Sequence, residues 1–314
     1  MPVRPPHRGC GDAGGSVEPS AVLAGDASAA AAHAQVSATG KVAASPPGAP
    51  ARIGPDPRAA AFFDVDNTVM RGASIFHLAR GMYARRFLRT PDILRFAWQQ
   101  TYFRLAGLEH ADHLEHARTS ALSFIRGHSV IELTRIAEDI FEDVMVTKIW
   151  PGTRAVAQLH LDQGERVWLV TAAPVEVARL IASRLGLTGA LGTVAEQRDG
   201  VYTGQLVGEL LHGPAKAEAV RALAEREDLD LQRCAAYSDS ANDIPMLSLV
   251  GRPCAVNPDA QLREHARLAG WQVREFRTGR RAASLGVKTA ARTGAMVGGM
   301  AAGVALRRRS SSPR

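Results

Sequence analysis

Four short polar segments contain the residue types that could do chemistry. They are Asp64–Thr68 (DVDNT), Thr171, Lys216 and Ser238–Asp243 (SDSAND). Together they supply four carboxylates, an amine, hydroxyl groups and backbone N–H groups. This set suits attack by a carboxylate on a phosphate ester, because a hard divalent cation held by oxygen ligands cancels the charge of the phosphate dianion.

Each residue has an expected role in such a reaction. Asp64 would attack phosphorus and form an aspartyl phosphate, and Asp66 would protonate the leaving oxygen and later activate water. Lys216 would offset the charge on Asp64 and on the phosphate, while Asp243 would either reach the metal through water or pair with Lys216. The expected Mg²⁺ ligands are Asp64, Asp66 through its backbone carbonyl, Asp239 and Asp243. The expected groups for the other phosphate oxygens are the hydroxyl of Thr171, the N–H of Ala172 and the amine of Lys216.

The elements that must position these residues alternate between strand and helix. Residues 59–66, 166–171 and 235–238 are short apolar runs that predict buried strands, and 216–226 predicts a helix that opens at Lys216. Such alternation predicts a mostly parallel α/β sheet with helices on both faces, and the site lies at the carboxyl ends of its strands. Further strands are expected at 254–256 and 271–276. A hairpin is expected around Asp199-Gly200, with arms at 193–197 and 201–206.

The rest of the chain divides by composition. Residues 1–57 are rich in Ala, Gly, Pro and Ser and predict a disordered segment, because few large apolar side chains can offset the ordering entropy. Residues 74–146 show helical periodicity with no strand and predict an inserted unit of about four helices. The catalytic core is then expected at 58–73 and 147–280, followed by an Ala/Gly-rich basic tail at 281–314.

Charge and cysteine content argue against other classes of partner. The formal net charge is +7, but acids and bases are mixed in the folded region, and no basic stripe interleaved with aromatics occurs. We therefore expect no nucleic-acid partner. The three cysteines are scattered, no signal peptide is evident and no stretch of about 20 apolar residues exists. A cytoplasmic protein is expected.

The motifs match, in order, those of a known family. DVDNT, Thr171, Lys216 and SDSANDIPML resemble the four motifs of the haloacid dehalogenase-like (HAD) hydrolase superfamily. The helical insert resembles its C1-type cap, and the hairpin followed by LVGELLHGPAK resembles the phosphoserine phosphatase-like branch, subfamily IB. The resemblance covers residues 59–277. It implies a Rossmann-like core, Mg²⁺, a small phosphorylated substrate and hydrolysis of its phosphomonoester, and it adds Asn242 as a contact to the substrate phosphate.

One position departs from the phosphoserine phosphatase pattern. Those enzymes carry a glutamate after the first motif that binds the serine amino group, and this sequence has Ala73 there. A phosphatase with another substrate, including a lipid-related one, is therefore an alternative hypothesis. A mutase-type phosphotransferase is another.

Two further features of the sequence suggest a non-catalytic or a metal-binding role. A membrane-associated interaction protein without catalysis is an alternative, and GxxxG spacing with three arginines in the tail suggests peripheral membrane contact. The intact motif set argues for an enzyme. His110, His113 and His116 share one predicted helix face and are interpreted as a solvated face rather than a metal site. The sequence does not indicate an oligomeric state.

Overall fold

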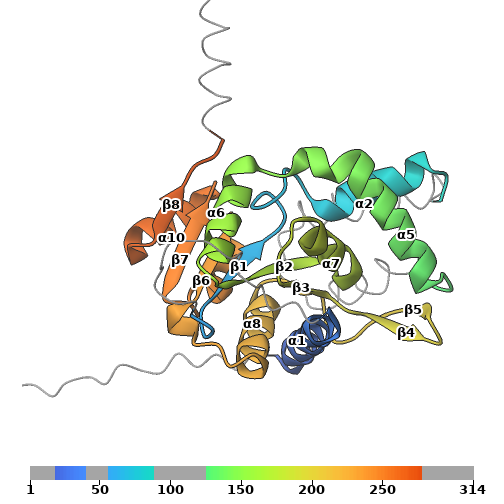
Figure 1. Cartoon of the computed structure of the whole chain (residues 1–314), viewed down its shortest axis with the longest axis horizontal. Helices are drawn as coiled ribbons and strands as arrows, with labels where there is room; N and C mark the ends of the chain where they lie inside the picture. The colour runs from blue at the N-terminus through green and yellow to red at the C-terminus, as the bar shows by residue number, and fades with distance from the viewer. Residues whose placement is uncertain (1–17, 40–55, 88–124, 278–314) are drawn as a thin grey trace, which may run out of the picture.

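The computed structural model describes residues 18–39, 56–87 and 125–277. At its centre is a six-stranded parallel sheet in the order β3-β2-β1-β6-β7-β8 (Figure 1). The strands are β1 (Ala60–Asp64), β2 (Arg166–Pro174), β3 (Gly189–Thr193), β6 (Ala235–Ser238), β7 (Arg252–Val256) and β8 (Gln272–Arg274). The predicted α/β fold with a parallel sheet is confirmed.

The central strands are buried on both faces. All five residues of β1 are buried, and successive side chains point to opposite faces, so Phe63 packs in one core and Phe62 in the other. One face is covered by α6 (Pro151–Asp162) and α7 (Val175–Arg184). The helices on the other face are α1 (Pro19–Thr39), α8 (Pro214–Arg226), α9 (Ile244–Leu247) and α10 (Ala260–Ala269).

The described part of the expected inserted unit is helical. Helix α2 (Ser74–Ala84) follows β1, and α5 (Val130–Ile140) precedes a π-helical turn, η1 (Phe141–Met145), and a 3₁₀ turn, η2 (Val146–Lys148). Gly81 of α2 approaches α5 so closely that a Cβ there would lie 2.6 Å from Ile140. Residues 88–124, with the three histidines, lie outside the described residues, so the boundaries of this unit stay a prediction.

The expectation of disorder across residues 1–57 is wrong for Pro19–Thr39, which form α1. Its buried face is a stripe of small residues at helical spacing: Ala21, Ala24, Gly25, Ser28, Ala29 and Ala32. Small side chains let two helix backbones approach closely, and a Cβ on Gly25 would lie 2.7 Å from the backbone N of Ala219 in α8. The helix therefore packs through close backbone contact rather than through large apolar side chains. Residues 1–17 and 40–55 lie outside the described residues.

Polar contacts also fix α1 to the core. Ser28 Oγ accepts a 3.0 Å hydrogen bond from the backbone N of Gly192 in β3, and His33 forms a 2.6 Å hydrogen bond with Glu227 at the end of α8. The guanidinium of Arg179 in α7 donates to the carbonyl of Ala31 at 2.6 Å. Because α8 carries Lys216, α1 supports one of the helices that build the site.

The predicted hairpin is present, with a shifted first arm. It consists of β4 (Ala195–Arg198) and β5 (Val201–Leu206), with Asp199 and Gly200 both at positive φ in the turn. Residues 189–193 form β3 of the main sheet, a strand that the sequence analysis missed. The predicted last strand is shorter than expected, at Gln272–Arg274.

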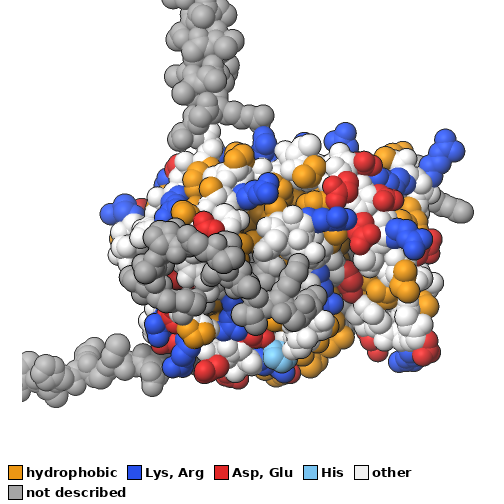
Figure 2. Space-filling model, in the orientation of Figure 1, with side chains coloured by type: hydrophobic (Ala, Val, Ile, Leu, Met, Phe, Trp, Pro, Cys, Tyr) orange, Lys and Arg blue, Asp and Glu red, His pale blue; other side chains and the backbone are white. Residues whose placement is uncertain are grey.

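No helix within the described ranges is long and apolar enough to cross a membrane. Figure 2 shows acidic and basic side chains interspersed over the face it presents, so charge of one sign does not dominate the described part of that face. The tail expected at 281–314, and its predicted membrane contact, lie outside the described residues.

Candidate active site

A buried ion-pair cluster lies at the carboxyl edge of the sheet. Asp64 is the last residue of β1, Lys216 lies in the first turn of α8 and Asp243 ends the 3₁₀ turn η4 (Ala241–Asp243). Lys216 Nζ donates to Asp64 Oδ1 at 2.5 Å and to Asp243 Oδ2 at 2.8 Å. All three residues are at most 5% exposed. One ammonium thus bridges two carboxylates that water hardly reaches.

Burial and neighbouring charge shift the titration of this cluster. Burial raises the pKa of Asp64 to about 8, with Lys216 opposing the rise and the nearby carboxylates adding to it. Burial alone would lower the pKa of Lys216, but Asp64 and Asp243 outweigh it and raise that pKa. Ser238 Oγ donates a further 2.7 Å hydrogen bond to Asp243 Oδ2. The cluster thus places two carboxyl groups around one ammonium in a desolvated place.

Asp239 lies beside this cluster, directly after β6. Its Oδ1 accepts a 3.4 Å hydrogen bond from Thr68, and Arg277 lies 3.6 Å from its Oδ2. Burial raises the pKa of Asp239 to about 6, partly opposed by Arg277. Among the described residues, no three His, Cys, Asp or Glu side chains converge as a complete metal site.

Asp66 lies in the tight turn that follows β1. Asn67 takes a left-handed conformation, with φ of 61°, and its side chain accepts a 3.1 Å hydrogen bond from the N–H of Gly72. This turn brings Asp66 Oδ1 to within 2.8 Å of the N–H of Ser74, the first residue of α2. A helix N-terminus favours a carboxylate, so α2 holds Asp66 at the entrance to the helical region.

The remaining predicted site residues lie outside the hydrogen-bonded cluster of Asp64, Lys216 and Asp243. Thr171 is buried in β2, and its Oγ1 accepts a 3.1 Å hydrogen bond from the N–H of Ala173, where the β2–β3 register shifts after Val170. Ala172 lines a cavity beside Asp66. Asn242 is the exposed residue of the turn η4, and its backbone N–H donates to Ser240.

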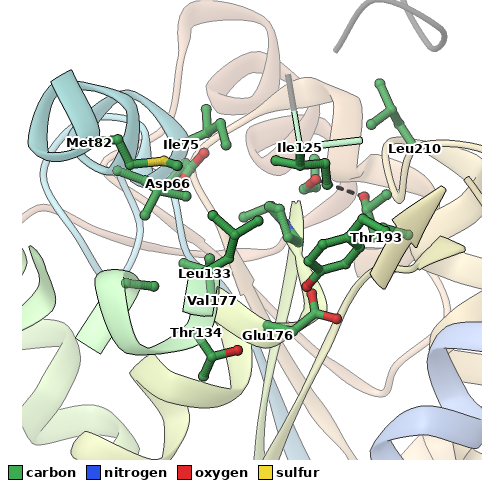
Figure 3. A pocket seen from close by; sticks show the side chains of 17 residues that line it. Asp66, Ile75, Met82, Ile125, Leu133, Thr134, Glu176, Val177, Thr193 and Leu210 are labelled. Atoms are coloured by element: carbon green, nitrogen blue, oxygen red, sulfur yellow. Dashed lines mark hydrogen bonds between the residues drawn. The ribbon is translucent and has the colours of Figure 1, made fainter. Parts of the chain in front are cut away.

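That cavity opens between the sheet edge and the helices of the inserted region. It has a volume of about 210 Å³, and its walls include Asp66, side chains from α2, α5 and α7, and the hairpin residue Tyr202. Figure 3 shows Asp66 beside Ile75 and Met82, across the cavity from Glu176. The cavity therefore places one predicted catalytic carboxylate against a space large enough for part of a substrate.

Several residues that shape the site were missed by the sequence analysis. Ser238 and Thr68, which hydrogen-bond Asp243 and Asp239, lie within the recognised motifs and could have been assigned from their position. Glu176 and Tyr202 lie far apart in the chain and meet only in the folded structure. No local pattern in the sequence marks them.

Comparison with known proteins agrees with the geometry of this site. The profile of haloacid dehalogenase-like hydrolases matches residues 61–248. The chain is 54% identical over 255 residues to phosphoserine phosphatase SerB1 of Mycobacterium tuberculosis, covering 81% of this chain and 82% of that protein. It is 37% identical over 221 residues to the inhibition of morphological differentiation protein of Streptomyces azureus, covering 70% and 79%. A solved structure of a protein of unknown function from Bordetella pertussis Tohama I aligns with a TM-score of 0.63 and 31% identity, covering 70% of this chain and 99% of that one.

The chain belongs to the family of haloacid dehalogenase-like hydrolases. Within that family it is phosphoserine phosphatase-like, a homologue of SerB1 of Mycobacterium tuberculosis. The predicted family resemblance is confirmed. Phosphatases of this family are typically magnesium-dependent.

Proposed function

We propose that this protein hydrolyses phosphate monoesters through an aspartyl phosphate on Asp64. The observation that carries the proposal is the pair between Asp64 and Lys216, 2.5 Å apart and buried at the carboxyl edge of the sheet. A free carboxylate is a weak nucleophile toward a phosphate dianion. Lys216 lowers the repulsion between them and fixes the direction from which Asp64 attacks.

The residues at this edge fit a magnesium ion. The carboxylates of Asp64, Asp239 and Asp243 outnumber the ammonium of Lys216 there, and burial penalises this excess negative charge. Asp64, Asp239 and the backbone carbonyl of Asp66 would hold the ion, with Asp243 contributing through water, and water and a phosphate oxygen would complete the shell that Mg²⁺ prefers. When bound, the ion supplies positive charge to the phosphate oxygens.

The rest of the proposed mechanism uses groups of this chain. An oxygen of Asp64 forms a bond to phosphorus while the bond from phosphorus to the ester oxygen breaks, and Asp66 gives its proton to that oxygen as the alcohol leaves. Asp66 then takes a proton from the water that attacks the aspartyl phosphate, which releases inorganic phosphate and frees Asp64. The hydrogen bond from the N–H of Ser74 supports this role, because it orients Asp66 toward the cavity.

The phosphate oxygens need donors of their own. We assign this role to Lys216, the hydroxyl of Thr171, the N–H of Ala172 and the side chain of Asn242. Thr171 Oγ1 already accepts a hydrogen bond from the N–H of Ala173, which leaves its O–H group to donate. Asn242 is exposed on η4, where it could reach a phosphate from the solvent side.

We propose a small phosphorylated compound as substrate and the cytoplasm as the place of action. Cys234 and Cys254 are buried free thiols, which suits a reducing compartment. Phosphoserine is the substrate named for the relative SerB1. In this chain Ala73, at the N-cap of α2, offers no side-chain group to bind a serine amine.

The test is release of inorganic phosphate from an aryl phosphate ester by the purified full chain. It is run with Mg²⁺, with a chelator, and with Asp64→Asn. We expect release that needs the metal and is lost in Asp64→Asn. Asp228→Asn is the matched control, since the Asp228 side chain is 88% exposed and pairs with Arg58 rather than with the cluster. Unchanged release in folded Asp64→Asn would refute the nucleophile.

A further inference from the structure

The cavity beside Asp66 has a chemical character that the proposed function leaves open. We propose that it binds the leaving group of the substrate, and that this group is uncharged and apolar, an alkyl or aryl alcohol rather than an amino acid. The inference rests on the proposed function, because it assumes that Asp66 gives its proton to the oxygen of that leaving group.

The walls of the cavity are mostly hydrocarbon. Ile75, Leu78 and Met82 of α2 line one side, Leu133 and Ala137 of α5 another, and Val177 of α7 a third. Ala137 and Val177 are buried in the same hydrophobic core as the sheet. A substrate group that enters this space exchanges water for hydrocarbon, which stabilises an apolar group and penalises a charged one.

On the wall, Thr193 and one oxygen of Glu176 already have hydrogen-bond partners, whereas Glu176 Oε2 is buried without one. Thr193 Oγ1 donates to the carbonyl of Ala172 at 2.7 Å and accepts from the N–H of Leu211 at 3.0 Å. Glu176 Oε1 accepts a 2.8 Å hydrogen bond from Gln197. Burial, together with the neighbouring charge of Glu176, raises the pKa of Tyr202, so its phenol stays neutral. Apart from Glu176 Oε2, these groups have little to offer a polar substrate.

The charge on the wall also excludes an anionic leaving group. Among the described residues that line the cavity there is no lysine, arginine or histidine, and the carboxyl groups are those of Asp66 and Glu176. The carboxylate of an amino acid would therefore enter without a cationic partner and close to like charge. Such an unpaired buried charge is strongly unfavourable.

The volume of the cavity limits the size of the leaving group that can enter it. An engineered apolar cavity of about 150 Å³ binds benzene. At about 210 Å³, this cavity has room for an aromatic ring or an alkyl chain of a few carbons. A longer chain would have to extend out of it.

The test compares kcat/KM of the full chain with Mg²⁺ for ethyl, butyl and hexyl phosphate, phosphoserine and phosphoethanolamine. We expect kcat/KM to rise roughly fourfold for each methylene that enters the cavity, and hexyl phosphate to exceed both amino esters. Equal or faster release from phosphoserine would overturn the inference while the proposed function stands. Faster release from phosphoethanolamine would overturn it too, because Glu176 would then recognise an ammonium. No release from any ester, the aryl phosphate included, would refute the proposed function and the inference with it.

Two variants locate the effect in the cavity. Ala137→Phe fills the space and is expected to lower the ratio of hexyl to ethyl kcat/KM about tenfold. Ile131→Phe is the matched control, because Ile131 lies on the same helix but is 74% exposed, and it should leave the ratio unchanged. Leu133→Ala enlarges the cavity and should shift the preference toward esters with a longer alkyl chain. This second variant keeps the test valid if Ala137→Phe does not fold. Unchanged ratios in folded Ala137→Phe and Leu133→Ala would overturn the inference.

Discussion

The proposed active site has two halves that differ in the chemistry of their side chains. The phosphate half consists of Asp64, Thr171, Lys216, Asp239 and Asp243, which lie at the carboxyl edge of the sheet and carry most of the charge. The leaving-group half is the cavity, whose walls come mainly from α2, α5 and α7 and are largely apolar.

Because of this difference, we expect the phosphate half to determine reactivity and the leaving-group half to determine which substrates are accepted. Every phosphate monoester carries the same dianion, so the phosphate half can be rigid and charged. Substrates differ in the alcohol, which the leaving-group half contacts. Asp66 lies where the halves meet, since it lines the cavity and influences the charge on Asp64. Variants in the phosphate half should therefore slow all esters alike, whereas variants of the cavity should change their ranking.

The largest effect is expected for Lys216→Met. Without the ammonium, Asp64 and Asp243 face each other in a buried place, so activity should fall about 10²–10³-fold on every ester. The free energy of unfolding should drop by about 3 kcal/mol, because a buried ion pair loses its partner. Phosphate-release assays and urea unfolding measure the two effects, with Lys148→Met as control. A loss confined to one ester would break the separation between the halves.

Asp66→Asn should lower kcat/KM about a hundredfold for alkyl esters and much less for aryl phosphates, because kcat/KM reports the steps through departure of the alcohol. An alkoxide needs the proton of Asp66 to leave, whereas an aryl oxide is a better leaving group. Asparagine keeps an oxygen for the hydrogen bond from the N–H of Ser74, so the turn should be retained. The values of kcat/KM for hexyl phosphate and an aryl phosphate are compared side by side. An equal fall for both would argue against Asp66 as the acid.

The phosphate half could be predicted from the sequence far better than the leaving-group half. Asp64 and Asp239 lie in short motifs at the ends of strands, and Lys216 lies at the start of a helix. A local pattern therefore predicts that all three lie at the carboxyl edge of the sheet. The cavity joins Met82, Leu133 and Tyr202 from distant segments. In the sequence, each of these residues looks like an ordinary core residue. Which of them come together depends on how the helices pack.

Helix α1 was missed for a different physical reason. Its buried stripe consists of Ala, Gly and Ser, whereas the prediction of disorder rested on the scarcity of large apolar residues. Alanine is the best helix former, and small residues suit close packing against α8. Helical spacing of small residues was the available indication.

Gly25→Leu tests this packing and the support it gives to the phosphate half. A side chain there meets the backbone of Ala219 at 2.7 Å, so α1 must move away from α8. We expect a loss of about 2 kcal/mol in the free energy of unfolding, with equal slowing of all esters if Lys216 shifts. Leu23→Ala, on the exposed side of α1, should stay within about 0.5 kcal/mol of the parent. Full stability of Gly25→Leu in urea would show that α1 does not pack tightly on α8.

The smallest effect is expected at Glu165, a buried carboxylate away from both halves. Burial alone would raise the pKa of Glu165, but its hydrogen bonds with His160 and Arg252 outweigh this and lower it below its usual 4.5. The stabilisation is therefore complete above the unfolded-state pKa and is lost as the pH falls through the lower folded-state pKa.

Glu165→Gln should accordingly cost about 1 kcal/mol at about pH 7 and less at about pH 3. Urea unfolding at both pH values measures the difference, and the ranking of esters should not change. A cost that is the same at both pH values would contradict the sign of this shift.

The most direct test of the central claim is to trap the phosphorylated enzyme. The protein with Mg²⁺ is mixed with an aryl phosphate, quenched in acid during turnover and digested, and the peptides are analysed by mass spectrometry. The account predicts a phosphoryl group on Asp64, absent from Asp64→Asn and accumulating in Asp66→Asn, in which water is not activated. A phosphoryl group on another residue, or turnover without any phosphorylated peptide, would contradict it.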